Sequence, residues 1–213
     1  MRVHGYYAIL DAAPALLDDP SALAQAARRL LAGGPCCLQL RAKAAGGRAM
    51  LEAARRLLPL CREHRVPFCV NDRPDVAVAA AADVVHLGQD DLPLSDALAL
   101  RGQLGRPDLV VGFSTHNRAQ AVAAAAAGAD YIGFGPVFAT ASKVNPDPVV
   151  GLDALRTVCS QVSIPVVAIG GIGLAQVPAV ASAGASAVAL ISAIATASDP
   201  AAAGREVAAA FQR

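Results

Sequence analysis

The chain has 213 residues, of which 55% are hydrophobic and 16% charged, and this composition excludes a disordered or collagen-like protein. Its 18 basic and 17 acidic side chains give a formal net charge of +1, too small for the broad positive face that nucleic acid or an anionic membrane requires. We therefore expect one domain over residues 1–213 with small molecules as its partners, and no nucleic acid or membrane among them.

The five cysteines form no Cys-x-x-Cys pair and have no zinc-type spacing with histidine, so neither a disulfide framework nor a zinc site is expected. Residues 1–7 lack the features of an export signal, which predicts a cytoplasmic protein. Residues 157–198 carry no charge, but prolines and glycines divide them into pieces of strand length. A membrane helix, which needs about twenty uninterrupted apolar residues, is therefore not expected.

Short apolar runs, typical of buried strands, alternate along the chain with longer segments of helical periodicity. Eight strands are predicted, at residues 6–10, 36–41, 67–72, 84–88, 109–115, 131–137, 164–170 and 187–192. Eight helices are predicted, at residues 21–32, 48–64, 75–81, 95–104, 118–127, 152–162, 174–183 and 200–212. Eight strand-helix units predict an α/β protein built as a single (β/α)8 TIM barrel. No Gly-x-Gly-x-x-Gly follows the first strand, which argues against a dinucleotide-binding sheet.

The active site of a (β/α)8 barrel lies at the carboxyl ends of its strands, so polar residues at those ends are the candidates. The second strand ends in Gln39, Arg41 and Lys43, alternating with apolar residues, and its period of two puts all three on one side. Only two of the 18 basic residues are lysines, Lys43 and Lys143, and both follow predicted strands. A compact ammonium group suits a phosphate oxygen, although a solvated surface position is the ordinary alternative.

Aspartates follow the third and fourth strands. Asn71 and Asp72 end the third strand, and Asp90 and Asp91 follow the fourth. Magnesium is usually held by one or two carboxylates together with waters and substrate phosphates. Asp72 with Asp91 or Asp90 therefore predicts a magnesium site, with a helix cap or a loop position as the alternative for each aspartate.

Polar residues also end the fifth and later strands. Ser114 and His116 share one side of the fifth strand and indicate ligand contacts, because no Gly-x-Ser-x-Gly motif marks a nucleophile. His86 lies inside the apolar fourth strand, which is more typical of an interior histidine than of a ligand contact. Gly171 follows the seventh strand and Ser192 ends the eighth, where barrels often bind phosphate through backbone N–H groups.

The connection after the sixth strand, residues 138–150, is long for so small a barrel. It carries two hydroxyls and a cation, in Thr140, Ser142 and Lys143. A long polar loop at the mouth of a barrel predicts a lid over the substrate.

Six motifs occur in order, at residues 39–43 (QLRAK), 71–73 (NDR), 86–93 (HLGQDDLP), 112–116 (GFSTH), 128–140 (GADYIGFGPVFAT) and 169–172 (IGGI). Together they resemble the thiamine phosphate synthases, barrel enzymes that join the pyrimidine and thiazole halves of thiamine. The resemblance spans most of the chain. One departure is Ser142, where the family often has threonine, and serine retains the hydroxyl.

The resemblance implies a site for two phosphorylated substrates, hydroxymethylpyrimidine diphosphate and hydroxyethylthiazole phosphate, with Mg²⁺ on Asp72 and Asp91. The implied substrate-binding residues are Gln39, Arg41, Lys43, Asn71, Ser114, His116, Thr140, Ser142, Lys143, Gly171, Ile191 and Ser192. The implied catalytic residues are Lys143, Arg41, Lys43 and Ser114. In this family the diphosphate leaves first, and the thiazole nitrogen captures the resulting pyrimidinylmethyl cation. Negative charge develops on the leaving diphosphate, so the reaction needs a metal ion and cationic side chains to stabilise that charge.

Three alternatives remain open. The related thiazole tautomerases share much of this pattern. They generally lack the second metal aspartate, so Asp91 favours the synthase. They also use a histidine at the position matching His116, so His116 keeps the tautomerase open as an alternative. A non-catalytic sensor of a thiamine precursor would have a degraded metal or diphosphate set. A phosphosugar isomerase would need a base facing the mouth, for which Cys69 is a poor candidate. The alanine-rich helices would also suit a homo-oligomer.

Overall fold

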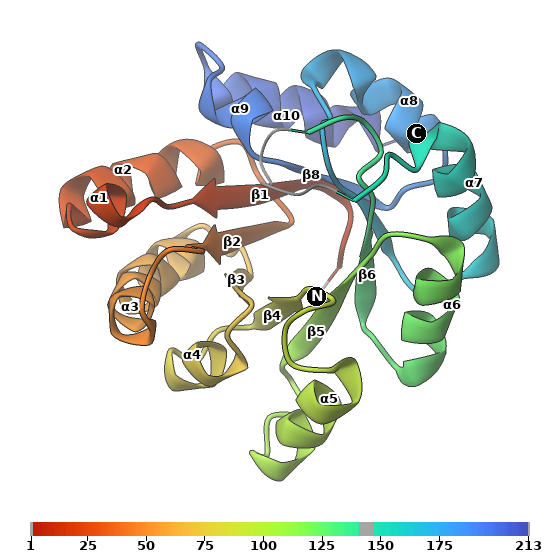
Figure 1. Ribbon diagram of the computed structural model, residues 1–213. Helices are drawn as coiled ribbons and strands as arrows, with labels where there is room; N and C mark the ends of the chain where they lie inside the picture. The colour runs from red at the N-terminus through yellow and green to blue at the C-terminus, as the bar shows by residue number, and fades with distance from the viewer. Residues whose placement is uncertain (1, 141–146, 213) are drawn as a thin grey trace.

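The computed structural model describes residues 2–140 and 147–212. Its eight strands close into one barrel in chain order, which confirms the predicted architecture, and the helices surround the strands (Figure 1). The strands are β1 (Gly5–Asp11), β2 (Cys37–Arg41), β3 (Phe68–Asn71), β4 (Val84–Leu87), β5 (Val110–Thr115), β6 (Tyr131–Phe134), β7 (Val166–Ala168) and β8 (Ala187–Leu190). Parallel pairing of β1 with β8 closes the barrel.

Helices follow the strands as the periodicity predicts. They are α2 (Pro20–Leu31), α3 (Gly47–Glu63), α4 (Pro74–Ala79), α5 (Leu94–Gln103), α6 (Arg118–Ala127), α7 (Gly151–Gln161), α8 (Val177–Ser182) and α10 (Pro200–Ala210). Side-chain caps start several of them, as where the Asp19 carboxylate accepts hydrogen bonds from the N–H groups of Ser21 and Ala22. None of the helices in the described part of the chain is long and apolar enough to cross a membrane.

The strand ends differ most from the prediction at the carboxyl ends of the sixth, seventh and eighth strands. The sixth and seventh strands stop before residues 137 and 170, since Pro136 has no N–H to donate and Gly170 adopts a left-handed φ of 86°. Ser192 was expected to end the eighth strand, but β8 ends at Leu190 and Ser192 begins the four-residue helix α9 (Ser192–Ala195). The sequence did not predict α1 (Pro14–Leu17), because a single turn shows no periodicity. The helix predicted over residues 174–183 is divided into the 3-10 turn η1 (Leu174–Gln176) and α8.

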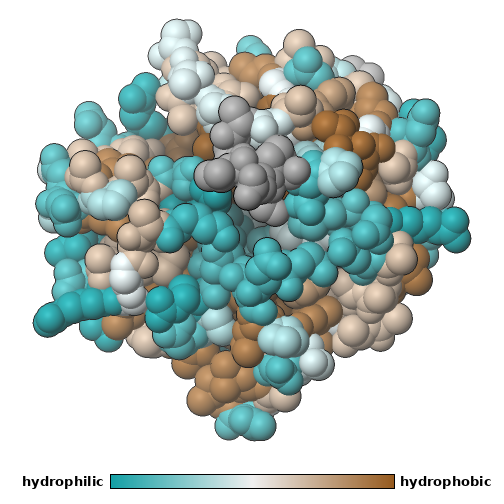
Figure 2. Space-filling model, in the orientation of Figure 1, coloured by the Kyte–Doolittle hydropathy of each residue, from teal (hydrophilic) through white to brown (hydrophobic). Residues whose placement is uncertain are grey.

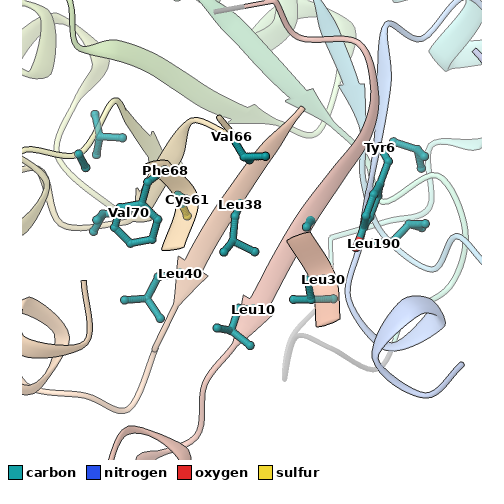
Figure 3. Close-up of a cluster of buried hydrophobic side chains, with 14 of the residues drawn as sticks. Tyr6, Leu10, Leu30, Leu38, Leu40, Cys61, Val66, Phe68, Val70 and Leu190 are labelled. Atoms are coloured by element: carbon teal, nitrogen blue, oxygen red, sulfur yellow. The ribbon is translucent and has the colours of Figure 1, made fainter. Parts of the chain in front are cut away.

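Successive side chains of each strand point alternately to the outside and the inside of the barrel, which produces two apolar layers. The outer layer packs against the helices, and Figure 3 shows part of it, with Leu38 and Leu40 of β2 beside Leu10 of β1 and Leu30 of α2. The inner layer fills the barrel with Tyr7, Cys37, Cys69, Val84, Tyr131, Val167, Ala187 and Ala189. Residues of the inner side that lie closer to the carboxyl ends of the strands are therefore directed to the mouth.

Candidate active site

A cavity of about 850 Å³ opens at the carboxyl ends of the strands. Its lining includes Ile9, Gln39, Asn71, His86, Ser114, Gly133, Ile169 and Ala189, which come from or directly follow the eight strands. Figure 2 shows hydrophilic residues gathered around the centre of this face of the molecule. A cavity of this size is typical of sites for small organic ligands.

Two cations lie at the mouth, and each contacts a carboxylate. The Arg41 guanidinium donates to both carboxylate oxygens of Asp11, at 2.6 and 2.7 Å, and the Lys43 ammonium lies 2.6 Å from the Asp72 carboxylate. Lys43 keeps 55% of its side-chain surface exposed. Arg41 and Lys43 therefore both lie at the mouth, each with a carboxylate that holds its long side chain in place.

Asp72 and Asp91 meet beside Lys43. Asp72 adopts a left-handed φ of 65°, which is rare outside glycine, and its N–H donates to the His86 carbonyl at 2.8 Å. The Asp91 carboxylate accepts from the Gly88 N–H at 2.7 Å. Burial and a hydrogen bond with the Asp72 carboxyl raise the pKa of Asp91, as happens when two carboxyl groups share a site.

This pair fits a hard cation with few protein ligands. Among the described residues no group of three or more His, Cys, Asp or Glu side chains could enclose a metal ion, so an all-protein cage is absent from this part of the chain. Magnesium, however, commonly uses one or two carboxylates and completes its shell with water and substrate phosphate. Asp90 also lines the cavity, but its side chain makes neither of the contacts made by Asp91.

A continuous chain of hydrogen bonds crosses the barrel beneath the cavity. Gln39 Nε2 donates to the Tyr7 hydroxyl at 3.0 Å, and the Tyr7 and Tyr131 hydroxyls lie 3.0 Å apart. Tyr131 continues to His86 Nδ1 at 3.0 Å, and His86 Nε2 lies 2.9 Å from Ser114 Oγ. We call these five residues the interior chain. Its two ends, Gln39 and Ser114, are predicted substrate contacts, whereas Tyr7, Tyr131 and His86 between them were not predicted to contact the substrate.

Burial keeps the interior chain uncharged. It lowers the pKa of His86 to about 4 and raises the pKa values of Tyr7 and Tyr131. At neutral pH the imidazole and both phenols are therefore neutral. The sequence did not indicate a role for the two tyrosines; the signal that could have done so is their place on the inner side of β1 and β6, where a buried hydroxyl needs a partner.

His116 lies at the rim beyond β5. Its Nδ1 lies 2.6 Å from the Gly135 carbonyl oxygen, which can only accept, so Nδ1 carries the hydrogen. Its Nε2 faces the Asp147 carboxylate at 3.5 Å. Asp147, which the sequence analysis did not single out, therefore brings a carboxylate from the long connection to the mouth.

The cavity lining also includes predicted substrate-binding residues that follow the sixth, seventh and eighth strands. Thr140, Gly171, Ile191 and Ser192 all line the cavity. Gly171 has a φ of 65°, and a Cβ added there would lie 2.2 Å from the Ala139 carbonyl oxygen, so glycine is required for this close approach. Two other predicted site residues, Ser142 and Lys143, lie outside the described part of the chain.

A closed (β/α)8 barrel with its polar residues concentrated at the carboxyl ends of the strands defines a barrel enzyme for small, charged substrates. The model of the thiamine monophosphate synthase family matches residues 6–194. The chain belongs to that family.

Relatives named as thiamine-phosphate synthases are similar in sequence to this chain over most of their length. The thiamine-phosphate synthase of Chlorobium phaeovibrioides is 49% identical over 174 residues, which are 82% of this chain and 81% of the relative. That of Anaeromyxobacter dehalogenans is 48% identical over 211 residues, or 99% of this chain and 89% of the relative. The solved structure of thiamine phosphate pyrophosphorylase from Pyrococcus furiosus has a TM-score of 0.84 at 35% identity, covering 99% of this chain and 96% of that one. A 3-hexulose-6-phosphate synthase, at 19% identity and a TM-score of 0.68, shares the fold alone.

Proposed function

We propose that the protein is a thiamine phosphate synthase, a transferase that condenses hydroxymethylpyrimidine diphosphate with hydroxyethylthiazole phosphate to give thiamine phosphate and diphosphate. The observation that carries this proposal is 48% identity to a named synthase over 99% of the chain. The arrangement of Lys43, Asp72 and Asp91 supports the proposal, because Asp72 contacts both other residues. The ammonium of Lys43 and a magnesium ion on the two aspartates would then act at one place on the leaving diphosphate.

The first half of the reaction breaks the bond between the pyrimidine methylene carbon and the diphosphate oxygen, and the electron pair leaves with the diphosphate. Lys43, Arg41 and Lys143 stabilise that charge, and Asn71 binds the same group. Asp72 and Asp91 would hold Mg²⁺, which neutralises diphosphate charge when bound. Diphosphate would replace Asp11 on Arg41 and Asp72 on Lys43, so both side chains start close to their final positions.

The second half forms a bond between the thiazole nitrogen and the pyrimidinylmethyl carbon. Backbone at Gly171 and side chains at Thr140, Ser142 and Ser192 bind the thiazole phosphate, and Ile191 contacts the ring. Gln39, Ser114 and His116 contact the substrates from the opposite strands. The acceptor is a ring nitrogen with its own lone pair, so the site needs no strong general base.

Direct assay of the product tests the proposal. The purified protein is incubated with both substrates and magnesium, and thiamine phosphate is oxidised to fluorescent thiochrome; the matched reaction contains a chelator in place of the metal. We expect magnesium-dependent product. Absence of product from folded protein would refute the synthase.

A second assay in the same preparation addresses the tautomerase. His116 lines the cavity, with its Nδ1 held by the Gly135 carbonyl and its Nε2 facing the Asp147 carboxylate, and a histidine so placed suits proton transfer. Isomerisation of the thiazole phosphate without synthase activity would assign the protein to that reaction, and binding without turnover would assign it to the sensor.

We further propose that the enzyme is cytoplasmic and forms a homo-oligomer. All five cysteines are free thiols, as is usual in a reducing compartment. Val122 on the alanine-rich helix α6 is 42% exposed, and small residues there allow close approach of a second copy. The molar mass of the purified protein, measured by light scattering as it elutes from a size-exclusion column, tests the homo-oligomer. The mass of a single chain would refute it.

A further inference from the structure

Two glycines make room for the interior chain. A Cβ added at Gly112 of β5 would lie 2.1 Å from Tyr131 Cζ, and one added at Gly133 of β6 would lie 3.3 Å from His86 Cε1. Atoms cannot approach so closely at the first position, so Tyr131 crosses the barrel only because Gly112 has no side chain. The tilted contact of Tyr7 with Tyr131 and the stacked contact of His86 with Tyr131 fill the space that results.

The direction of the hydrogen bonds follows from what each group can donate. The Gln39 amide nitrogen has no acceptor lone pair, so Tyr7 must accept from it. Tyr7 can then donate to Tyr131, and Tyr131 can donate to His86 Nδ1. A neutral imidazole that accepts at Nδ1 carries its hydrogen on Nε2, which donates to Ser114 Oγ. Each hydrogen donated along the interior chain then meets an oxygen or nitrogen acceptor, and the Ser114 hydroxyl keeps its own hydrogen for a group in the cavity.

The reverse direction is chemically poorer. Ser114 would donate to His86, His86 to Tyr131 and Tyr131 to Tyr7, which would then accept two hydrogen bonds. The Tyr7 hydrogen would be left with the thiols of Cys37 or Cys69, which contact its hydroxyl. Sulfur is a weak acceptor, so the free energy of the buried network favours the first direction.

We propose that Tyr7, Tyr131 and His86 are positioning residues that act through Ser114, orienting the Ser114 hydroxyl hydrogen into the cavity as a hydrogen-bond donor to the substrate. Because His86 Nε2 already carries a hydrogen, it cannot remove the hydroxyl proton, and Ser114 is not a nucleophile. The inference concerns the same cavity as the proposed function but does not depend on the reaction for its first test, which uses the free protein.

The tautomer of His86 can be read directly by NMR of protein labelled with ¹⁵N in histidine. We expect His86 to carry its hydrogen on Nε2, with its signals assigned by their loss in His86→Gln. His116 provides the internal comparison for an Nδ1 that carries a hydrogen, since the Gly135 carbonyl oxygen accepts from it. A His86 hydrogen on Nδ1 would establish the reverse direction and overturn the proposal, whether or not the protein makes thiamine phosphate.

Kinetics then separate positioning from simple support of the fold. We expect Tyr131→Phe to lower kcat/KM about tenfold, the effect of losing one useful hydrogen bond. Tyr6→Phe is the matched control, because the buried Tyr6 hydroxyl has no hydrogen-bond partner among the described residues, and it should leave kcat/KM unchanged.

The double variant distinguishes action through Ser114 from an independent role. If Tyr131 acts through Ser114, Tyr131→Phe with Ser114→Ala should be no slower than Ser114→Ala alone. Multiplying losses would show that Tyr131 acts by another route and would overturn the proposal. Circular dichroism and urea unfolding of each variant confirm that the compared proteins are folded.

Discussion

The buried imidazole of His86 should make the stability of the barrel depend on pH between 6.5 and 4. In the unfolded chain a histidine titrates at its ordinary pKa of about 6.5, whereas burial lowers the pKa of His86 in the folded protein to about 4. Between these values the unfolded state binds more protons, so the free energy of unfolding falls as the pH falls. The contribution of His86 is complete above pH 6.5 and lost below pH 4.

The magnitude follows from the same difference. At about 1.4 kcal/mol for each pH unit, the His86 contribution falls by about 2 kcal/mol between pH 7.5 and pH 5 and by about 3 kcal/mol over the whole range. The assay is urea unfolding at pH 7.5 and pH 5, followed by circular dichroism, for the wild-type protein and His86→Gln. The variant should lose about 2 kcal/mol less on acidification, whatever its stability at pH 7.5.

His64→Gln is the matched control, because His64 is exposed at the end of α3. Its loss of stability on acidification should equal that of the wild-type protein. Equal losses for wild-type and His86→Gln would refute the reasoning, since they would mean that His86 titrates normally and the interior chain does not exclude the charged imidazole.

Three further predictions concern catalysis. Lys143→Ala should lower kcat about a hundredfold, the scale of one lost electrostatic contact to a transition state; an unchanged kcat would remove Lys143 from the mechanism. Asp91→Asn should raise the magnesium concentration that gives half-maximal rate, while Asp90→Asn leaves it unchanged, and equal effects in a magnesium titration would contradict the assignment to Asp91. Gly171→Ala should raise KM for the thiazole phosphate, because the added Cβ would meet the Ala139 carbonyl oxygen; an unchanged KM would place the phosphate elsewhere.

The barrel could be predicted from the sequence because alternation and helical periodicity are local signals. The same signals failed at the strand ends, where the apolar residues around Pro136 continue the strand pattern although the proline cannot donate to the ladder. Ser192 illustrates the other limit, since four residues of helix carry too little periodicity to be distinguished from a strand end.

Alternation also predicted the side of β2 and β5 on which Gln39 and Ser114 lie, and both line the cavity. It did not predict Tyr7 and Tyr131, because tyrosine in an apolar strand is typical of an ordinary core residue. Nor did it predict that Asp11 would bind Arg41, since that contact depends on the register of β1 against β2. Contacts between strands distant in sequence need the closed barrel before they can be specified.

The interior chain has a consequence for assembly of the fold. Its members come from β1, β2, β4, β5 and β6, and the hydrogen bond between Tyr7 and Tyr131 joins residues 124 positions apart. A half-barrel intermediate would therefore lack the floor of the cavity even if its own strands were correctly paired. Recovery of ligand binding during refolding should thus mark ring closure rather than the formation of secondary structure.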